Sequence, residues 1–130
     1  MIVPDASAVV EVLLQTERGQ RLEARLFAPG ETLHVPHLLD VEAAHALRRP
    51  WLRGLLDERR GAEALDDLAA WLLIRYPHDL FLSRMWMLRH HVTAYDAVYV
   101  ALAEALAVPL LTCDARLAAS HEHDAVIELA

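Results

Sequence analysis

Short runs of apolar and β-branched residues alternate with longer helix-like segments along the whole chain. The first such run, Ile2–Pro4, is followed by helical periodicity through Leu14. Parallel strands must be joined by crossovers that are usually helices, whereas a helical bundle would not need the β-branched runs. The alternation therefore predicts a three-layer α/β/α fold around a mainly parallel central sheet. No linker, repeat or low-complexity stretch divides the 130 residues, so a single domain is expected over residues 1–130.

The same pattern places the remaining elements. Further strands are predicted at Thr32–Val35, Ile74–Tyr76, Val108–Thr112 and Val126–Leu129. Helices are predicted at Arg18–Phe27, from about His37 onward, and at Glu63–Leu73, Asp79–His90, Thr93–Leu106 and Asp114–Ala119. Proline lacks a backbone N–H and clashes inside a helix, so Pro50 is expected to kink the long helix or to begin a new one.

The charged residues exclude several classes of function. The chain has 19 acidic and 12 basic residues and a formal net charge of −7, which argues against holding nucleic acid by bulk electrostatics alone. All the basic residues are arginine, so P-loop nucleotide hydrolysis and Schiff-base chemistry, which need lysine, are excluded. The 4 glycines never form G-x-G, so a dinucleotide-binding loop is absent as well.

The compartment can be predicted from a few local features. Cys113 is the only cysteine, which suits a reducing cytosol and excludes an internal disulfide or a thiolate metal site. The N-terminal stretch has no basic region of the kind that begins a signal peptide. Glu104 and Pro109 interrupt the most apolar stretch, Ala97–Cys113, which is therefore expected to be a buried helix and strand rather than a membrane span. A soluble cytoplasmic protein is predicted.

Four acidic residues occupy positions where a parallel α/β sheet binds ligands. Asp5 and Asp114 each follow a predicted strand, and Asp96 lies in the first turn of a predicted helix. Glu42 projects from the apolar side of another helix, where an unpaired charge is unfavourable. Because ligands bind outside the carboxyl ends of parallel strands, these four acids are expected to meet at one edge of the sheet.

Two interpretations of these acids remain open at this point. Asp5 and Asp114 could serve only as helix N-caps, and Asp96 could only brace the helix that begins near Thr93. A cation site accounts for all four together, since a hard divalent ion relieves the repulsion between packed carboxylates. With oxygen ligands and no thiolates, Mg²⁺ is the expected ion and Mn²⁺ is possible.

Two hydroxyl residues stand close to these acids in the sequence. Ser7 and Thr112 are each two residues from an acid, and their side chains could orient the metal ligands or an attacking water. The alternative is that both hydroxyls only cap or turn the backbone, as serine and threonine often do.

Four sequence blocks, in this order, are similar to those of a known family. They are D-A-S-A at Asp5–Ala8; L-L-D-V-E at Leu38–Glu42 with A-L-R-R at Ala46–Arg49; T-A-Y-D-A-V-Y-V-A-L-A at Thr93–Ala103; and L-L-T-C-D-A-R-L-A at Leu110–Ala118. In their order, spacing and coverage of nearly the full length, these blocks resemble PIN-domain ribonucleases, and among them the VapC-type toxins of toxin–antitoxin pairs.

The resemblance implies a PIN-like domain and a Mg²⁺- or Mn²⁺-dependent endoribonuclease toxin, with tRNA or another structured RNA as substrate. It also implies a homodimer and neutralisation by a cognate VapB-type antitoxin. Asp5, Glu42, Asp96 and Asp114 match the acidic quartet of the family position by position. The alternatives are a PIN nuclease of RNA processing or flap cleavage without a toxin role, and an inactive PIN interaction module.

The sequence departs from the family at two places. Pro50 and Trp51 stand where relatives usually continue a helix with aliphatic residues, which leaves the local shape near the antitoxin-facing surface open. His45 stands where asparagine is frequent, and we expect it to be a partly buried histidine.

RNA must be guided toward an acidic site by positive charge. Over residues 48–60 the arginines exceed the acids by three, and guanidinium groups suit phosphate oxygens. Arg48, Arg49 and Arg53 are therefore candidates for RNA contact, with solvated or antitoxin-paired arginines as the alternative. Arg116, next to Asp114, is a candidate either for backbone contact or for an internal ion pair.

Histidines and large apolar residues give only weak indications of a zinc site and of a partner surface. The pairs His90-His91 and His121-Glu122-His123 do not have the H-E-x-x-H spacing of a zinc helix, so surface histidines are expected. The tryptophans and their methionine neighbours have helical spacing that is typical of core, with a partner surface as the alternative. These residues are Trp51, Trp71, Trp86, Met85 and Met87.

Overall fold

The computed structural model describes residues 1–130, and all strand pairs in it are parallel. One sheet has the order β1-β4-β5 and the other pairs β2 with β3, while an isolated parallel bridge between Ile2 and Leu33 joins them. The strands thus run side by side in the order β3-β2-β1-β4-β5, and the predicted α/β fold with a parallel sheet is confirmed. Their bounds are β1 Val3–Pro4, β2 Leu33–Pro36, β3 Leu73–Tyr76, β4 Leu110–Thr112 and β5 Ile127–Leu129.

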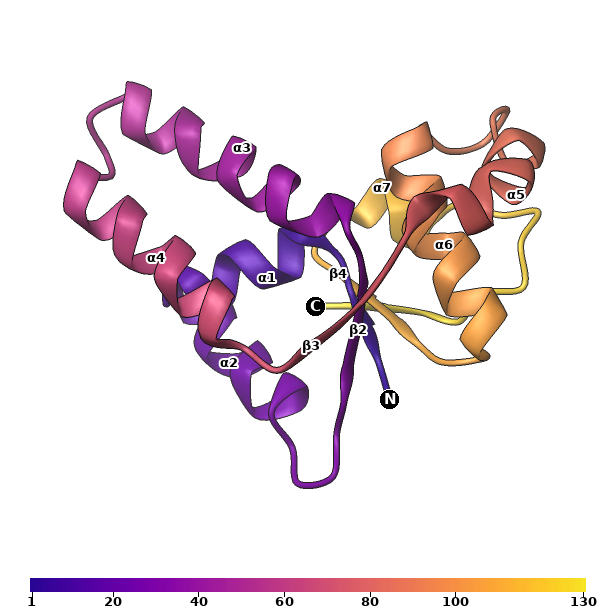
Figure 1. The fold of residues 1–130 in the computed structure, drawn as a ribbon, viewed down its shortest axis with the longest axis horizontal. Helices are drawn as coiled ribbons and strands as arrows, with labels where there is room; N and C mark the ends of the chain where they lie inside the picture. Colours follow the sequence, from indigo (N-terminus) through magenta and orange to yellow (C-terminus); the bar gives the residue numbers. More distant parts are fainter.

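The helices divide into two groups about the strands. In Figure 1 the first group lies to the left of the strands and the second to the right, so the strands form the middle layer. The first group is α1 Ala6–Leu13, α2 Glu17–Leu26, α3 Leu38–Leu52 and α4 Glu58–Ala70. The second is the 3₁₀ helix η1 His78–Phe81, α5 Leu82–Met87, α6 Ala94–Leu106 and α7 Ala115–Ala118. None of these helices combines the length and the apolar character that crossing a membrane requires.

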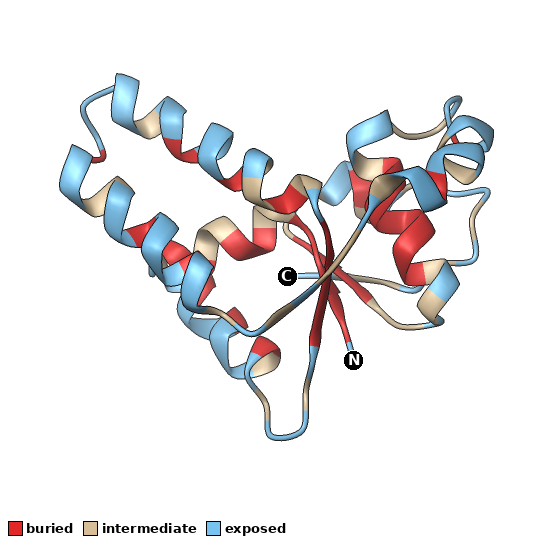
Figure 2. Cartoon of the chain, in the orientation of Figure 1, coloured by how far each residue is buried: buried red, intermediate tan, exposed pale blue.

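Helix α6 is the centre of the core. Its residues Ala97–Ala103 are all buried, which the uniformly apolar sequence of this stretch explains. Figure 2 shows this helix buried around its circumference, whereas α3 and α4 expose one side. The helix that carries Asp96 is therefore held firmly on all sides.

A close contact joins α1 to α2. A Cβ atom on Gly19 would lie 1.9 Å from the carbonyl oxygen of Glu11, a separation that no side chain can adopt. Glycine at this position thus allows α2 to pack directly on the backbone of α1, the helix that Asp5 caps.

Several predicted boundaries were wrong. The helix expected at Glu63–Leu73 begins earlier, because Asp57 caps it by accepting from the Arg60 amide at 2.7 Å, and it ends at Ala70. The helix expected at Asp79–His90 is divided into η1 and a short α5 that ends at Met87.

Pro50 does not begin a new helix, which was one of the two outcomes expected there, because α3 continues through it to Leu52. The proline lies in the last turn, where its missing N–H removes one bond near an exposed helix end. Its carbonyl accepts from the Leu55 amide at 2.9 Å, which helps to turn the chain toward α4.

The core interpretation of the large apolar residues holds for only some of them. Trp51, Trp86 and Met87 are exposed, Trp86 to 69%. Trp71 is half-buried and packs edge-on against Phe27, with ring centroids 5.0 Å apart. Their helical spacing was that of amphipathic segments, but α3 and α5 turn these positions toward solvent.

Candidate active site

Asp5 is the most enclosed acid of the site. It follows β1, is 5% exposed and caps α1, with Oδ1 accepting from the Ala8 amide at 3.0 Å. The Asp5 amide itself donates to the carbonyl of Leu111, so strand pairing fixes the residue beside β4. Asp5 is thus an N-cap, as the simpler interpretation expected, but its second carboxylate oxygen is not used by the helix.

Ser7 and Thr112 both hold the Asp5 carboxylate. Ser7 Oγ donates to Asp5 Oδ1 at 2.6 Å, and Thr112 Oγ1 donates to Asp5 Oδ2. Each hydroxyl is in turn held by a backbone amide, that of Cys113 at 2.8 Å for Ser7 and that of Asp114 at 2.9 Å for Thr112. The two hydroxyls therefore join the end of β1 to the end of β4 and fix how Asp5 faces the site.

Asp114 begins α7 at the end of the neighbouring strand. Its Oδ1 accepts from the Arg116 amide at 2.8 Å, and its Oδ2 lies 3.5 Å from the Arg116 guanidinium. These contacts, the backbone hydrogen bond first, hold the pKa of Asp114 below its ordinary value. Asp114 is thus the one acid of the four with a cationic partner in direct contact.

Asp96 lies in the first turn of α6, half-buried. The cap of this helix is Thr93, whose Oγ1 accepts from the Asp96 amide at 3.2 Å. Burial raises the pKa of Asp96, the Thr93 hydroxyl opposes this, and the charges of Asp114 and Asp5 raise it further.

Glu42 projects from α3 and is held by a residue that sequence reasoning missed. Tyr99, on α6, donates its hydroxyl to Glu42 Oε2 at 2.5 Å. Burial raises the pKa of Glu42, this hydrogen bond opposes it, and the charges of Asp96 and Asp5 add to the rise. The only signal for Tyr99 was a hydroxyl within the otherwise apolar run after Asp96.

The four acids thus come from four separate elements and interact electrostatically. Burial raises the pKa of Asp5, Glu42 and Asp96, and the charges of other acids of the quartet raise the pKa of Glu42 and Asp96 further. A bound cation opposes both effects, because it favours the charged carboxylates. All their ligand atoms are carboxylate oxygens, the donors that Mg²⁺ and Mn²⁺ prefer. The donor set therefore fits a hard divalent cation.

The arrangement of the quartet is open rather than closed. The group of three potential metal ligands whose ligand atoms all lie within 4.8 Å of one another is His91, His121 and Glu122, which includes no member of the quartet. Mg²⁺ usually keeps several waters and takes only one or two carboxylates directly, so an open arrangement is compatible with it.

A pocket adjoins Glu42 on the outer side of the site. It has a volume of about 480 Å³ and is lined by Leu38, Val41, Glu42, His45 and Tyr95. His45 is exposed, so the expectation that it is partly buried was wrong. Tyr95, next to Asp96 and 62% exposed, is a second residue that sequence reasoning did not single out.

The candidate arginines are not gathered around the acids. Arg48, Arg49 and Arg53 are exposed on the far half of α3 and make no ion pair, and Arg48 lies about 9 Å along the helix from Glu42. Arg116 is exposed and contacts Asp114. The structure therefore places one arginine at the acids and three on a separate surface.

Comparisons with known proteins agree on one family. The PIN domain family model matches residues 2–121 of the chain. The chain is 45% identical over 129 residues to ribonuclease VapC12 of Mycobacterium tuberculosis, covering 99% of this chain and 98% of that protein.

Solved structures share the fold. A Pyrobaculum aerophilum protein superposes with a TM-score of 0.71 at 24% identity, over 97% of this chain and 81% of that one. VapC20 of Mycobacterium tuberculosis, described as a sarcin–ricin loop cleaving toxin, has a TM-score of 0.67 at 17% identity, over 92% of this chain and 94% of that one. At such identities the likeness shows the fold alone.

Proposed function

Because the chain belongs to the PIN-domain family, and within it to the VapC ribonucleases, we propose that it is a metal-dependent endoribonuclease toxin. The observation that carries the proposal is the acidic quartet: Asp5 and Asp114 follow β1 and β4, Glu42 and Asp96 project from α3 and α6, and three of the four have raised pKa values. A buried carboxylate without a cationic partner is costly, and none of these three has a cation in direct contact.

Asp5, Glu42, Asp96 and Asp114 would hold Mg²⁺ or Mn²⁺, directly or through water. The ion supplies Lewis-acid polarisation of the phosphodiester and a water of lowered pKa. Ser7 and Thr112 keep Asp5 in one orientation, and Tyr99 does the same for Glu42. Since water rather than the ribose 2′-hydroxyl attacks phosphorus, the products carry 5′-phosphate and 3′-hydroxyl ends.

The substrate is proposed to be tRNA or another structured RNA. Unstacked bases are recognised by stacking on aromatic side chains, and the pocket beside Glu42 presents His45 and Tyr95 for this. Arg48, Arg49 and Arg53 would contact phosphates at a distance from the cleaved bond, and Arg116 would contact one close to it.

The partners are proposed from the same family membership. A VapB-type antitoxin would neutralise the enzyme, and the protein would act in the cytoplasm as a homodimer and a single domain. Exposed apolar residues at the end of α3, including Trp51, Leu52 and Leu55, offer a surface for such contacts.

The test is cleavage of total RNA by the purified protein with Mg²⁺, followed by sequencing of the new 5′ ends. We expect 5′-phosphate ends at a few sites, and at least a 100-fold loss of rate in Asp5→Asn and Asp96→Asn, each checked for folding by circular dichroism. Products with 2′,3′-cyclic phosphate would contradict the mechanism. Full activity of the folded variants would remove the quartet from catalysis, and no cleavage by the wild type would favour the inactive interaction module.

The toxin role has its own test. Expression should arrest growth, and a small protein encoded by the adjacent gene should relieve the arrest. A nuclease that cleaves RNA without affecting growth would instead belong to RNA processing.

A further inference from the structure

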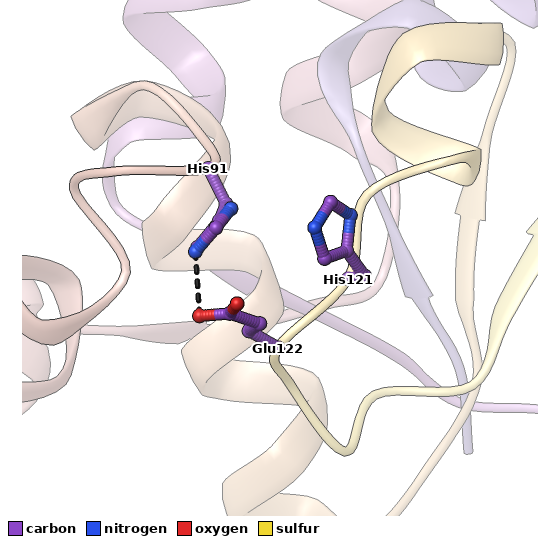
Figure 3. A group of neighbouring side chains, drawn as sticks. All are labelled: His91, His121 and Glu122. Carbon is purple, nitrogen blue, oxygen red and sulfur yellow. Dashed lines mark ion pairs between the residues drawn. The ribbon is translucent and has the colours of Figure 1, made fainter.

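We propose that His91, His121 and Glu122 form a zinc-binding site distinct from the acidic quartet. His91 lies on the turn after α5, and the other two follow α7, so the site joins segments about thirty residues apart. Figure 3 shows the three side chains converging on one another across the gap between these segments. The sequence spacing concealed the site, because its ligands come from two loops rather than one helix.

The distances are those of a site that needs only side-chain rotation to close. His91 Nε2 lies 2.6 Å from Glu122 Oε2, and the His91 and His121 rings have centroids 4.8 Å apart. The ligand atoms of all three lie within 4.8 Å of one another. Ligands about 2.0–2.1 Å from a tetrahedral zinc are separated by about 3.4 Å, so the groups must move by little more than 1 Å.

The donor set selects zinc over the ion expected at the quartet. Two imidazole nitrogens and one carboxylate oxygen are a common zinc combination, whereas Mg²⁺ prefers oxygen donors alone. His121 and Glu122 are exposed and His91 is partly exposed, so an ion can enter from solvent. Three protein ligands leave a fourth position for water.

The two loops are held in place independently of any metal. The His91 amide donates to the carbonyl of Leu88 at 3.0 Å. On the other side, Ser120 Oγ donates to the carbonyl of Leu117 at 2.6 Å, and the Asp124 amide donates to Glu104 at 2.9 Å. Two of the ligands thus stand in a segment that is anchored at both ends.

Glu122 adopts a backbone conformation that is unusual for its residue type. Its φ is +64°, in the left-handed region that glycine and asparagine occupy readily but glutamate does not. Its carboxylate points toward His91 (Figure 3). Uncommon backbone conformations of this kind gather at ligand sites, where the surrounding structure maintains them.

A zinc ion here would fasten the segment before α6 to the segment after α7. His91 is five residues before Asp96, and His121 is seven residues after Asp114. The inference does not depend on the proposed ribonuclease function, since it concerns only metal binding and stability.

The test uses untagged protein that carries Asp5→Asn and Asp96→Asn, so that the quartet does not compete for metal. After removal of metal with EDTA, equilibrium dialysis against Zn²⁺ should find one ion per chain, and Co²⁺ should give the visible absorption of a tetrahedral site. His121→Ala and Glu122→Gln in this background should weaken zinc binding about 100-fold. His90→Ala is the matched control, because His90 neighbours the site without belonging to it, and it should bind zinc normally.

A second readout is the unfolding temperature, which Zn²⁺ should raise in the background protein and in His90→Ala but not in His121→Ala. Should His121→Ala fail to fold, Glu122→Gln and the Co²⁺ spectrum decide the question alone. The proposal is overturned if the background protein binds no zinc, or if His121→Ala and Glu122→Gln bind it as tightly as His90→Ala does. In either case the cluster is an ion pair and nothing more.

Discussion

Tyr99 on α6 donates a 2.5 Å hydrogen bond to Glu42 on α3, although the two residues are 57 positions apart in the sequence. Tyr99 is 1% exposed, so its hydroxyl has no access to bulk water and Glu42 is its partner. Burial and the charge of Glu42 raise the pKa of Tyr99, which keeps the hydroxyl protonated as a donor. The position of one quartet member thus depends on the core helix that carries another.

Removing this hydroxyl should weaken metal use without unfolding the protein. In Tyr99→Phe, Glu42 loses the group that orients it, and groups that support a metal ligand typically contribute 10–100-fold in affinity. We expect the Mg²⁺ concentration for half-maximal RNA cleavage to rise about tenfold. The control is Tyr95→Phe, which removes an exposed hydroxyl in the first turn of the same helix and keeps the aromatic ring proposed to stack on RNA. An unchanged Mg²⁺ dependence in Tyr99→Phe would show that Glu42 needs no such support.

Neutralising Glu42 should stabilise the metal-free protein. Its pKa is raised from the ordinary 4.5, so folding favours the protonated form, and stability is lost as the pH rises through the folded-state pKa. At pH 7 in EDTA, Glu42→Gln should therefore raise the unfolding free energy by about 0.5–2 kcal/mol, an effect that vanishes near pH 4. Glu23→Gln, at an exposed position on α2, should leave the unfolding free energy unchanged at pH 7 and near pH 4. A destabilised Glu42→Gln at pH 7 would mean that the hydrogen bond from Tyr99 outweighs both the burial of the Glu42 charge and its repulsion by Asp96 and Asp5.

Adding Mg²⁺ should make the wild type more stable than variants in which an acid of the quartet has been neutralised. An ion that binds only the folded state stabilises it by about 2.7 kcal/mol at one hundred times its dissociation constant. The unfolding temperature of the wild type should rise with Mg²⁺, and that of Asp96→Asn should rise far less. EDTA should abolish RNA cleavage and Mn²⁺ should restore it. Equal shifts in both proteins would place the Mg²⁺ outside the quartet.

Charge reversal at Arg48 and Arg49 should weaken RNA binding through electrostatics. Both side chains are exposed and make no ion pair, so substitution by glutamate leaves no broken internal contact. We expect a lower affinity and a salt dependence reduced by about one in slope for each lost phosphate contact. Arg21→Glu, at an exposed position on α2 where Arg21 pairs only with the exposed Glu17, serves as the control for net charge. An effect equal to that of Arg21→Glu would argue against a specific role for these two arginines.

Gly19 and Gly61 should respond oppositely to alanine. A Cβ at Gly19 would lie 1.9 Å from the backbone oxygen of Glu11, so Gly19→Ala must push α2 from α1 and should cost more than about 3 kcal/mol. At Gly61, in α4, the nearest atom would be Leu56 Cδ at 3.6 Å, an ordinary contact, and alanine should add about 0.5–1 kcal/mol. Denaturant unfolding of both variants measures the difference. A stable Gly19→Ala would show that the two helices can move apart at little cost.

Much of the site was predictable from general rules. Asp5 and Asp114 follow strands, and the carboxyl ends of parallel strands share one edge, so their proximity needed no knowledge of the packing. Glu42 was identifiable because a charge on the apolar face of a helix is unfavourable unless it is paired or binds a cation.

Other parts depend on three-dimensional packing that spacing does not record. Nothing in the sequence distinguished Tyr99 from a core aromatic, because its hydrogen bond to Glu42 on α3 exists only in the folded chain. Trp86 was expected in the core because of its helical spacing, but α5 turns it outward, and this depends on where the short helix meets α6. His91 and Glu122 belong to two loops whose separation cannot be inferred from either segment alone.

The order of the strands also bears on how the protein is made. Strand β1 precedes every other strand in the sequence, yet it occupies the middle of the sheet, and one of its neighbours is β4 at Leu110–Thr112. A nascent chain of one hundred residues therefore already contains Asp5, Glu42 and Asp96 but lacks the strand and the Thr112 hydroxyl that hold Asp5 in place. Asp5 can therefore be fixed in the site only after a strand more than one hundred residues further along the chain has joined the sheet.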